Sequence, residues 1–96
     1  SSDDKPVALI CEDNPDMSRF VAETLSERFN VLRAMDGREG LAKAKAARPD
    51  LIVSDIMMPN MSGDQLVRAL RDDETLRSTP ILLLSARADD ELRVEL

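Results

Sequence analysis

The segment LIVSDIMMPNMSG, residues 51–63, places an acid just behind a short apolar run and follows it with a loop rich in methionine. Residues 51–53 are aliphatic, Asp55 follows after one serine, and Pro59 and Gly63 punctuate the loop. An apolar run of this length, bounded by turn residues, is typical of a strand buried on both faces of a parallel sheet. Gly63 can take a positive φ in the turn beyond this strand.

Three further runs have the same character. Val7–Cys11 and Ile81–Leu84 are continuous and apolar, and residues 31–34 form a weaker run. The segments between these runs carry apolar residues at intervals of three and four, which predicts amphipathic helices. The helical stripes are Met17, Phe20, Val21 and Leu25; Leu41, Ala44 and Ala47; and Leu66, Ala69 and Leu70.

Helix-start signals support this division of the chain. Asn14 precedes Pro15, as an N-cap precedes a first-turn proline, and Ser62 can cap the helix that contains Leu66. Strands and helices then alternate regularly, and such units make parallel neighbours with right-handed crossovers. The sequence therefore predicts an α/β fold, a three-layer sandwich around a parallel sheet.

Composition narrows the functional classes. The chain has 96 residues, enough for one small domain, and a formal net charge of −6, which opposes direct binding to nucleic acid or to an anionic membrane. No apolar stretch approaches the about 20 residues that span a bilayer, and nothing resembles a signal peptide. Cys11 is the only cysteine, so no internal disulfide is possible. We expect a cytoplasmic protein whose domain covers residues 1–96, with residues 1–5 frayed.

Three acids follow predicted strands, and the chain has no histidine that could do their chemistry. Glu12 and Asp13 come after the first strand and Asp55 after the third, although an acid at any one such position is also a common turn residue. If the strand order is 2-1-3-4, the three carboxylates converge where ligands of open parallel sheets bind. Their repulsion calls for a cation, and oxygen ligands favour Mg²⁺. Asp55 can then act as a nucleophile that forms an acyl phosphate.

Three stretches of the chain resemble the signature motifs of response-regulator receiver domains. They are Cys11-Glu12-Asp13-Asn14, the segment from Asp55 to Pro59 with Gly63, and Leu84-Ser85-Ala86. Their order and spacing match the family across essentially the whole chain. The resemblance implies a five-stranded parallel sheet of order 2-1-3-4-5 with five helices.

The resemblance also implies a role for each site residue. Asp55 would accept a phosphoryl group from a histidine kinase or phosphotransfer domain. Asp13, Asp55 and the backbone carbonyl of Met57 would hold Mg²⁺, with Glu12 acting through water, and Ser85 would be the switch hydroxyl that bonds the phosphoryl oxygen. Such a receiver catalyses at most its own phosphorylation and dephosphorylation, so no separate enzymatic activity is expected.

The C-terminal part departs from the family pattern. Receivers carry a lysine at the end of the fifth strand, whereas the last lysine here is Lys45. We therefore expect a truncated receiver, a flavodoxin-like sheet of order 2-1-3-4 with the fifth strand and fifth helix missing. Residues 86–96 read as a helix that stops without a cap. The edge of Ile81–Leu84 would then be unpaired, which predicts self-association as a dimer.

Other interpretations remain open. A Mg²⁺-dependent phosphohydrolase of the haloacid dehalogenase type also uses a strand-end aspartate, but its pattern has a second acid where this chain has Met57. A non-phosphorylated interaction module could keep the fold without the chemistry. Metal–thioether binding by Met57, Met58 and Met61 fits poorly beside hard carboxylates, so these methionines are expected to pack or to face a partner.

Overall fold

The computed structural model describes residues 5–84 and 93–95. Strands and helices alternate up to residue 71, as the sequence predicts, and each predicted strand is present. The elements are β1 (Val7–Cys11), α1 (Pro15–Leu25), β2 (Asn30–Ala34), α2 (Gly37–Ala47), β3 (Leu51–Asp55), α3 (Gly63–Arg71), β4 (Ile81–Leu84) and β5 (Arg93–Glu95). No helix within these ranges is both long and apolar enough to cross a membrane.

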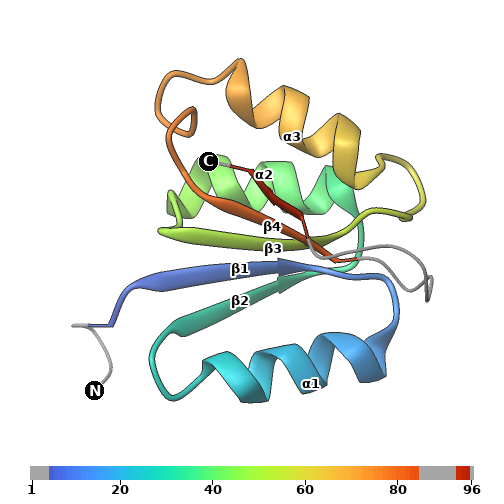
Figure 1. The fold of residues 1–96 in the computed structure, drawn as a ribbon, viewed down its shortest axis with the longest axis vertical. Coiled ribbons are helices and arrows are strands. Elements are labelled where there is room, and N and C mark those ends of the chain that lie inside the picture. Colours follow the sequence, from blue (N-terminus) through green and yellow to red (C-terminus); the bar gives the residue numbers. More distant parts are fainter. Residues whose placement is uncertain (1–4, 85–92, 96) are drawn as a thin grey trace.

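The strands form one sheet of order β2-β1-β3-β4-β5, in which β1 to β4 are parallel. Helix α1 covers one face, and α2 and α3 cover the other (Figure 1). The three-layer α/β sandwich and the strand order 2-1-3-4 are therefore confirmed. The chain leaves β1 for β2 on one side and returns to β3 on the other, which opens the carboxyl edge of the sheet between β1 and β3.

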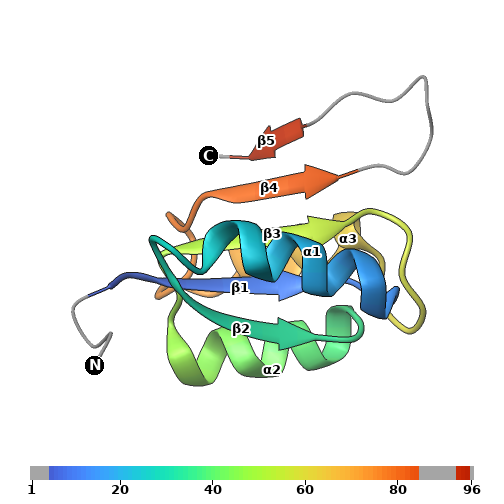
Figure 2. The ribbon, with the colours of Figure 1, turned by 90° about the horizontal axis from the view of Figure 1, so that it is seen from below.

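Strand β5 corrects two predictions for the C-terminal stretch. Its residues pair antiparallel with β4, with Val94 opposite Leu82, so they do not belong to a helix and the β4 edge is not unpaired. Figure 2 shows β5 running against the other four strands. Residues 85–92 are too few for the crossover of about a dozen residues that a parallel neighbour needs, whereas an antiparallel neighbour needs only a loop. The remainder of the predicted helix lies outside the described residues.

Both predicted helix caps are confirmed. The Asn14 side chain accepts hydrogen bonds from the backbone N–H groups of Asp16 (2.9 Å) and Met17 (3.1 Å). Ser62 and Gln65 form a reciprocal capping box at the start of α3, since each side chain bonds the other's backbone N–H. These caps satisfy N–H groups that have no partner within the helix. They fix where the two loops that follow β1 and β3 end.

The apolar core lies mainly between the sheet and the layer of α2 and α3. Ala44 of α2 and Leu66 and Leu70 of α3 are fully buried and belong to one cluster with Leu9 and Ile52 of the sheet. Each buried leucine contributes roughly 1.5–3 kcal/mol relative to an exposed one. This face therefore supplies most of the hydrophobic stabilisation.

The face under α1 is less completely covered. The apolar stripe of α1 correctly predicts a helix, yet Phe20 is 66% exposed and Met17 is 45% exposed. An apolar groove of about 200 Å³ lies between α1 and the sheet, and its lining includes Leu25 of α1 with Val53 and Leu82 of the sheet. Within the described residues one helix covers this face whereas two cover the other, so the stripe is only partly buried.

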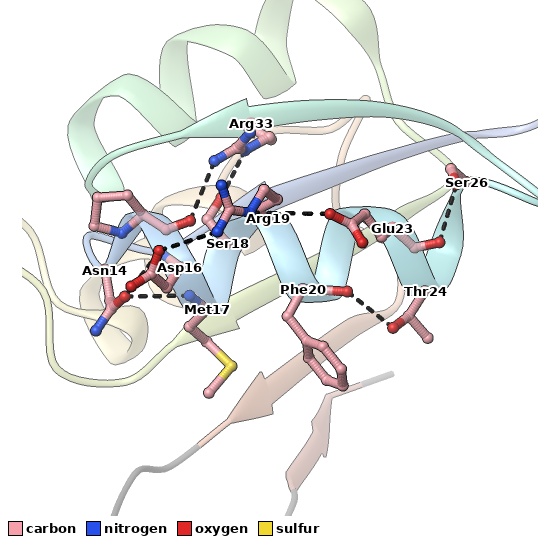
Figure 3. Close-up of polar contacts among 11 residues, drawn as sticks. Asn14, Asp16, Met17, Ser18, Arg19, Phe20, Glu23, Thr24, Ser26 and Arg33 are labelled. Carbon is pink, nitrogen blue, oxygen red and sulfur yellow. Dashed lines mark hydrogen bonds and ion pairs between the residues drawn. The ribbon is translucent and has the colours of Figure 1, made fainter.

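Arg33 of β2 ties the first turn of α1 to the sheet through a buried hydroxyl (Figure 3). Its Nε donates to Ser18 Oγ at 2.8 Å, and its Nη2 donates to the carbonyl oxygen of Pro15 at 3.4 Å. Ser18 is 1% exposed, and a buried hydroxyl without a partner costs about 1–3 kcal/mol. The contact therefore holds in place the turn that directly follows the acids after β1.

Gly40 sets how closely α2 approaches the sheet, because a Cβ at this position would overlap the buried sulfur of Cys11. We expect Gly40→Ala to lower the free energy of unfolding by about 1–3 kcal/mol through overpacking, despite its better helix propensity. Cys11→Ala removes the obstructing sulfur, so the double variant should lose less free energy of unfolding than the two single variants lose in sum. Urea denaturation followed by circular dichroism measures the cycle. Strictly additive effects would contradict the close contact.

Candidate metal centre

The carboxyl edge of the sheet brings together the three acids that the sequence singles out. Cys11 is opposite Ser54 in the pairing of β1 with β3, so Glu12 and Asp55 leave the sheet side by side. One carboxylate oxygen from each of Glu12, Asp13 and Asp55 can be chosen so that all three lie within 4.8 Å of one another. The predicted convergence of acids some forty residues apart is confirmed.

The three carboxyl groups differ in their contact with solvent. Glu12 is 8% exposed, Asp55 is half-buried and Asp13 is exposed. The backbone N–H of Asn14 donates to Glu12 Oε2 at 3.1 Å, and the Glu12 backbone N–H donates to the carbonyl oxygen of Ala34 at 3.0 Å. Glu12 is therefore held against the sheet, while Asp13 reaches outward beside it.

The pKa of Glu12 is raised from its ordinary value of 4.5 to about 7, and burial is the largest cause. A hydrogen bond with the Asp13 side chain and the negative charges of Asp55 and Asp13 contribute to this rise, and the hydrogen bond from the Asn14 N–H opposes it. Both charges that act on Glu12 are negative, so neither of them stabilises its ionised form. A bound cation would reverse this balance.

The donor set fits a hard divalent cation. All three groups offer carboxylate oxygen, which suits Mg²⁺ or Ca²⁺ and not a soft metal. Mg²⁺ binds through one or two carboxylates and keeps several waters, so a cluster with one buried and two more accessible acids meets its needs. The residues present therefore fit the Mg²⁺ that the sequence predicts.

Backbone hydrogen bonds anchor both ends of the loop between β3 and α3. The backbone N–H of Ile56 donates to the carbonyl oxygen of Leu84 at 3.1 Å, and the N–H of Gly63 donates to that of Ile56 at 2.8 Å. Met58 and Met61 pack against the core, as predicted, whereas Met57 is 73% exposed and a partner contact there stays a prediction. The side chain of Met57 thus faces solvent.

Gly63 is needed for a reason other than the one predicted. The positive φ in this loop belongs to Asn60, at 68°, and not to Gly63. A Cβ on Gly63 would lie 2.5 Å from the carbonyl oxygen of Asp55, so only glycine lets α3 begin this close to the acid. The freedom of Gly63 to take a positive φ is not used, because the residue lies in the first turn of α3.

Sequence reasoning missed the pair formed by Asn60 and Asp36. Asn60 Nδ2 donates to Asp36 Oδ2 at 2.7 Å, which joins the β3–α3 loop to the turn before α2. Asp36 also caps α2, and the spacing of Asp36 and Glu39 is a capping signal that could have located one member. Ser85, predicted as the switch hydroxyl, lies outside the described residues.

The sequence from residue 8 to residue 96 matches the family model of the response regulator receiver domain. The chain belongs to this family. It is 55% identical over 92 residues to hybrid signal transduction histidine kinase D of Dictyostelium discoideum, a match that covers 96% of this chain and 6% of that protein. It is 46% identical over 93 residues to sensor histidine kinase TmoS of Ectopseudomonas mendocina, covering 97% of this chain and 10% of that protein.

Solved structures agree with the receiver fold. The chemotaxis response regulator CheY4 of Vibrio cholerae aligns with a TM-score of 0.83 and 38% sequence identity, over 88% of this chain and 72% of that chain. The receiver described here thus spans a small part of the two histidine kinases and about three quarters of a receiver of known structure.

The raised pKa of Glu12 predicts how the stability of the metal-free receiver depends on pH. The folded state binds this proton more tightly than the unfolded state, so the stabilisation is fully present below about pH 4.5 and is lost as the pH rises through about 7. Asp36, Glu39 and Asp73 have lowered pKa values and lose their stabilisation in the opposite direction, as the pH falls through the acid range below this window.

Glu12→Gln should therefore flatten the decline in melting temperature between about pH 4.5 and 7, because glutamine does not titrate. Thermal unfolding followed by circular dichroism in the presence of a chelator measures this profile. The matched control is Glu74→Gln, an exposed position beyond α3 that should keep the wild-type slope. Identical profiles for Glu12→Gln and the wild type would contradict the assignment.

Proposed function

We propose that this receiver takes a phosphoryl group onto Asp55 from a histidine kinase or phosphotransfer domain, with Mg²⁺ as cofactor. The observation that carries the proposal is the cluster of Glu12, Asp13 and Asp55 within 4.8 Å at the carboxyl edge of the sheet. Asp13 and Asp55 would hold Mg²⁺ directly, together with the backbone carbonyl of Met57, and Glu12 would act through a water molecule. Bound Mg²⁺ neutralises charge on the carboxylates and on the incoming phosphoryl oxygens.

Asp55 is the acid best placed for the chemical step. It ends β3, is half-buried, and is held by the backbone contacts of Ile56 and Gly63 on its C-terminal side. A carboxylate oxygen of Asp55 attacks the phosphorus of a phosphohistidine; the new P–O bond forms as the P–N bond breaks, and the electron pair of that bond stays on the imidazole nitrogen. Asp13 and Glu12 hold negative charge beside it, which the cation offsets.

The resemblance to receiver domains implies two further groups, a switch hydroxyl and a lysine. The switch role of Ser85 stays a prediction, since it lies outside the described residues, and the sequence carries no lysine after Lys45. The receiver is expected to catalyse at most its own phosphorylation and dephosphorylation.

The alternatives have less support. A phosphohydrolase of the haloacid dehalogenase type would have an acid at position 57, where the exposed Met57 stands. A non-phosphorylated interaction module would have no reason to keep three converging carboxylates at a cost in stability. Self-association remains a prediction, but its expected site changes, because β5 covers the β4 edge and leaves only a short edge strand. A cytoplasmic location also remains a prediction.

Asp55→Asn tests the acceptor directly. With Mg²⁺ and acetyl phosphate, we expect the wild-type chain to gain one phosphoryl group and Asp55→Asn to gain none, because an amide cannot form the acyl phosphate. Intact mass spectrometry measures the gain. Asp72→Asn, which changes an exposed acid just after α3, is the matched control and should label like the wild type.

Two outcomes would contradict the proposal. Equal labelling of Asp55→Asn and the wild type would place the acceptor elsewhere. No gain in the wild type, together with no binding of the phosphoryl mimic beryllofluoride, would favour the interaction module.

A further inference from the structure

A single hydrogen bond joins the loop beyond Asp55 to the start of α2. Asn60 Nδ2 donates to Asp36 Oδ2 at 2.7 Å, across 24 residues of sequence. We call this bond the Asn60–Asp36 latch. It connects the segment that contains Met57 to the turn between β2 and α2, where Asp36 caps α2.

The acceptor side of the latch is firmly oriented. Asp36 Oδ1 accepts from the backbone N–H of Glu39 at 2.8 Å, and Glu39 Oε1 accepts from the backbone N–H of Met35 at 2.7 Å. Lys43 pairs with Glu39 Oε2 at 3.0 Å. The bonds from the N–H of Glu39 and from the Asn60 amide hold the pKa of Asp36 below its ordinary value, so this carboxylate is ionised at neutral pH.

The donor side takes a backbone conformation that few residues adopt. Asn60 has φ of 68°, in the left-handed region that asparagine tolerates better than other side chains apart from glycine. The next residue, Met61, is half-buried against the core, and its carbonyl oxygen abuts Gly37, where a Cβ would overlap it. The loop therefore meets the start of α2 at two consecutive residues, Asn60 through the latch and Met61 through its close packing on Gly37.

The path of the loop depends on these contacts. Its two ends are fixed by the bond from Gly63 N–H to the Ile56 carbonyl oxygen, which leaves residues 57–62 as a closed excursion. Met57 is 73% exposed, so its own side chain does little to fix its backbone. Met58 packs against the core next to Met57, and Asn60 and Met61 hold the far side of the excursion against the start of α2.

We propose that Asn60 is a positioning residue for the metal centre, because the Asn60–Asp36 latch sets the path of residues 57–61 and thereby the approach of the Met57 carbonyl to the carboxylates of Asp13 and Asp55. This inference rests on the proposed function. The coupling is reciprocal: if the latch increases the affinity for a cation, then a bound cation stabilises the latched loop by the same free energy.

The test exchanges the two members of the latch. Asn60→Asp sets two carboxylates against each other. The double variant Asp36→Asn/Asn60→Asp restores both bonds, because the new amide at position 36 can accept from Glu39 N–H and donate to the new carboxylate at position 60. The double variant also keeps the wild-type net charge. Asp36→Asn alone is the matched control, because asparagine is an equally good N-cap and the Asn60 amide can turn over to accept its hydrogen bond.

Isothermal titration with MgCl₂ gives the first readout. We expect Asn60→Asp to weaken Mg²⁺ affinity about three- to tenfold, the worth of one typical hydrogen bond, although the added negative charge alone would strengthen it. The double variant and Asp36→Asn should bind within about twofold of the wild type. Unchanged or stronger binding by Asn60→Asp, or no recovery in the double variant, would overturn the proposal.

Amide hydrogen exchange in the metal-free chain gives the second readout. The N–H groups of Met61 and Gly63 bond to the carbonyl oxygens of Pro59 and Ile56, and both should exchange faster in Asn60→Asp and recover in the double variant. Unchanged exchange would overturn the latch itself. No Mg²⁺ binding by the wild type would overturn the metal role and the proposed function, while the exchange data would still report on the loop.

Discussion

Three carboxyl groups crowded at one edge of a sheet repel one another, and most of the local architecture of this receiver bears on that repulsion. Glu12 is buried, the charges acting on it are negative, and its pKa rises to about 7 as a result. Without a cation, repulsion between the carboxylates lowers the stability of the fold at neutral pH. With a cation bound, the same closely spaced carboxylates contribute to cation affinity. The apolar core compensates for this repulsion, because packing of α2 and α3 on β1 and β3 holds in place the two strands that lead into the acids.

The loops around the cluster are fixed by small, specific contacts. Gly63 lets α3 start against the backbone of Asp55, and Asn14 closes the turn after Asp13 while its N–H holds Glu12. Arg33 secures the first turn of α1 through Ser18. Each contact involves a backbone group or a short polar side chain. The groups that shift the pKa of Glu12 are Asn14, Asp13 and Asp55, none of which is basic.

Much of the fold and of the acid cluster could be predicted from the sequence, because both depend on local patterns. Apolar runs indicated the strands, Asn14 and Ser62 indicated the helix starts, and an acid directly after a buried strand must emerge at the carboxyl edge. What failed depends on tertiary structure. The antiparallel pairing of β5 with β4 follows from the length of the connection between them. The exposure of Phe20 depends on what covers α1, which the apolar stripe of a helix does not reveal. The positive φ at Asn60 and its bond to Asp36 join positions that no periodicity connects.

The most direct measurement of the central claim is a titration of the ¹⁵N-labelled chain with MgCl₂, followed through its amide resonances. We predict saturable shifts for the amides of residues 12–14 and 55–57, with one Mg²⁺ bound per chain, and loss of that saturation in Asp13→Asn. Weak shifts spread over exposed acids such as Glu23 and Glu27, without saturation and unchanged in Asp13→Asn, would contradict it.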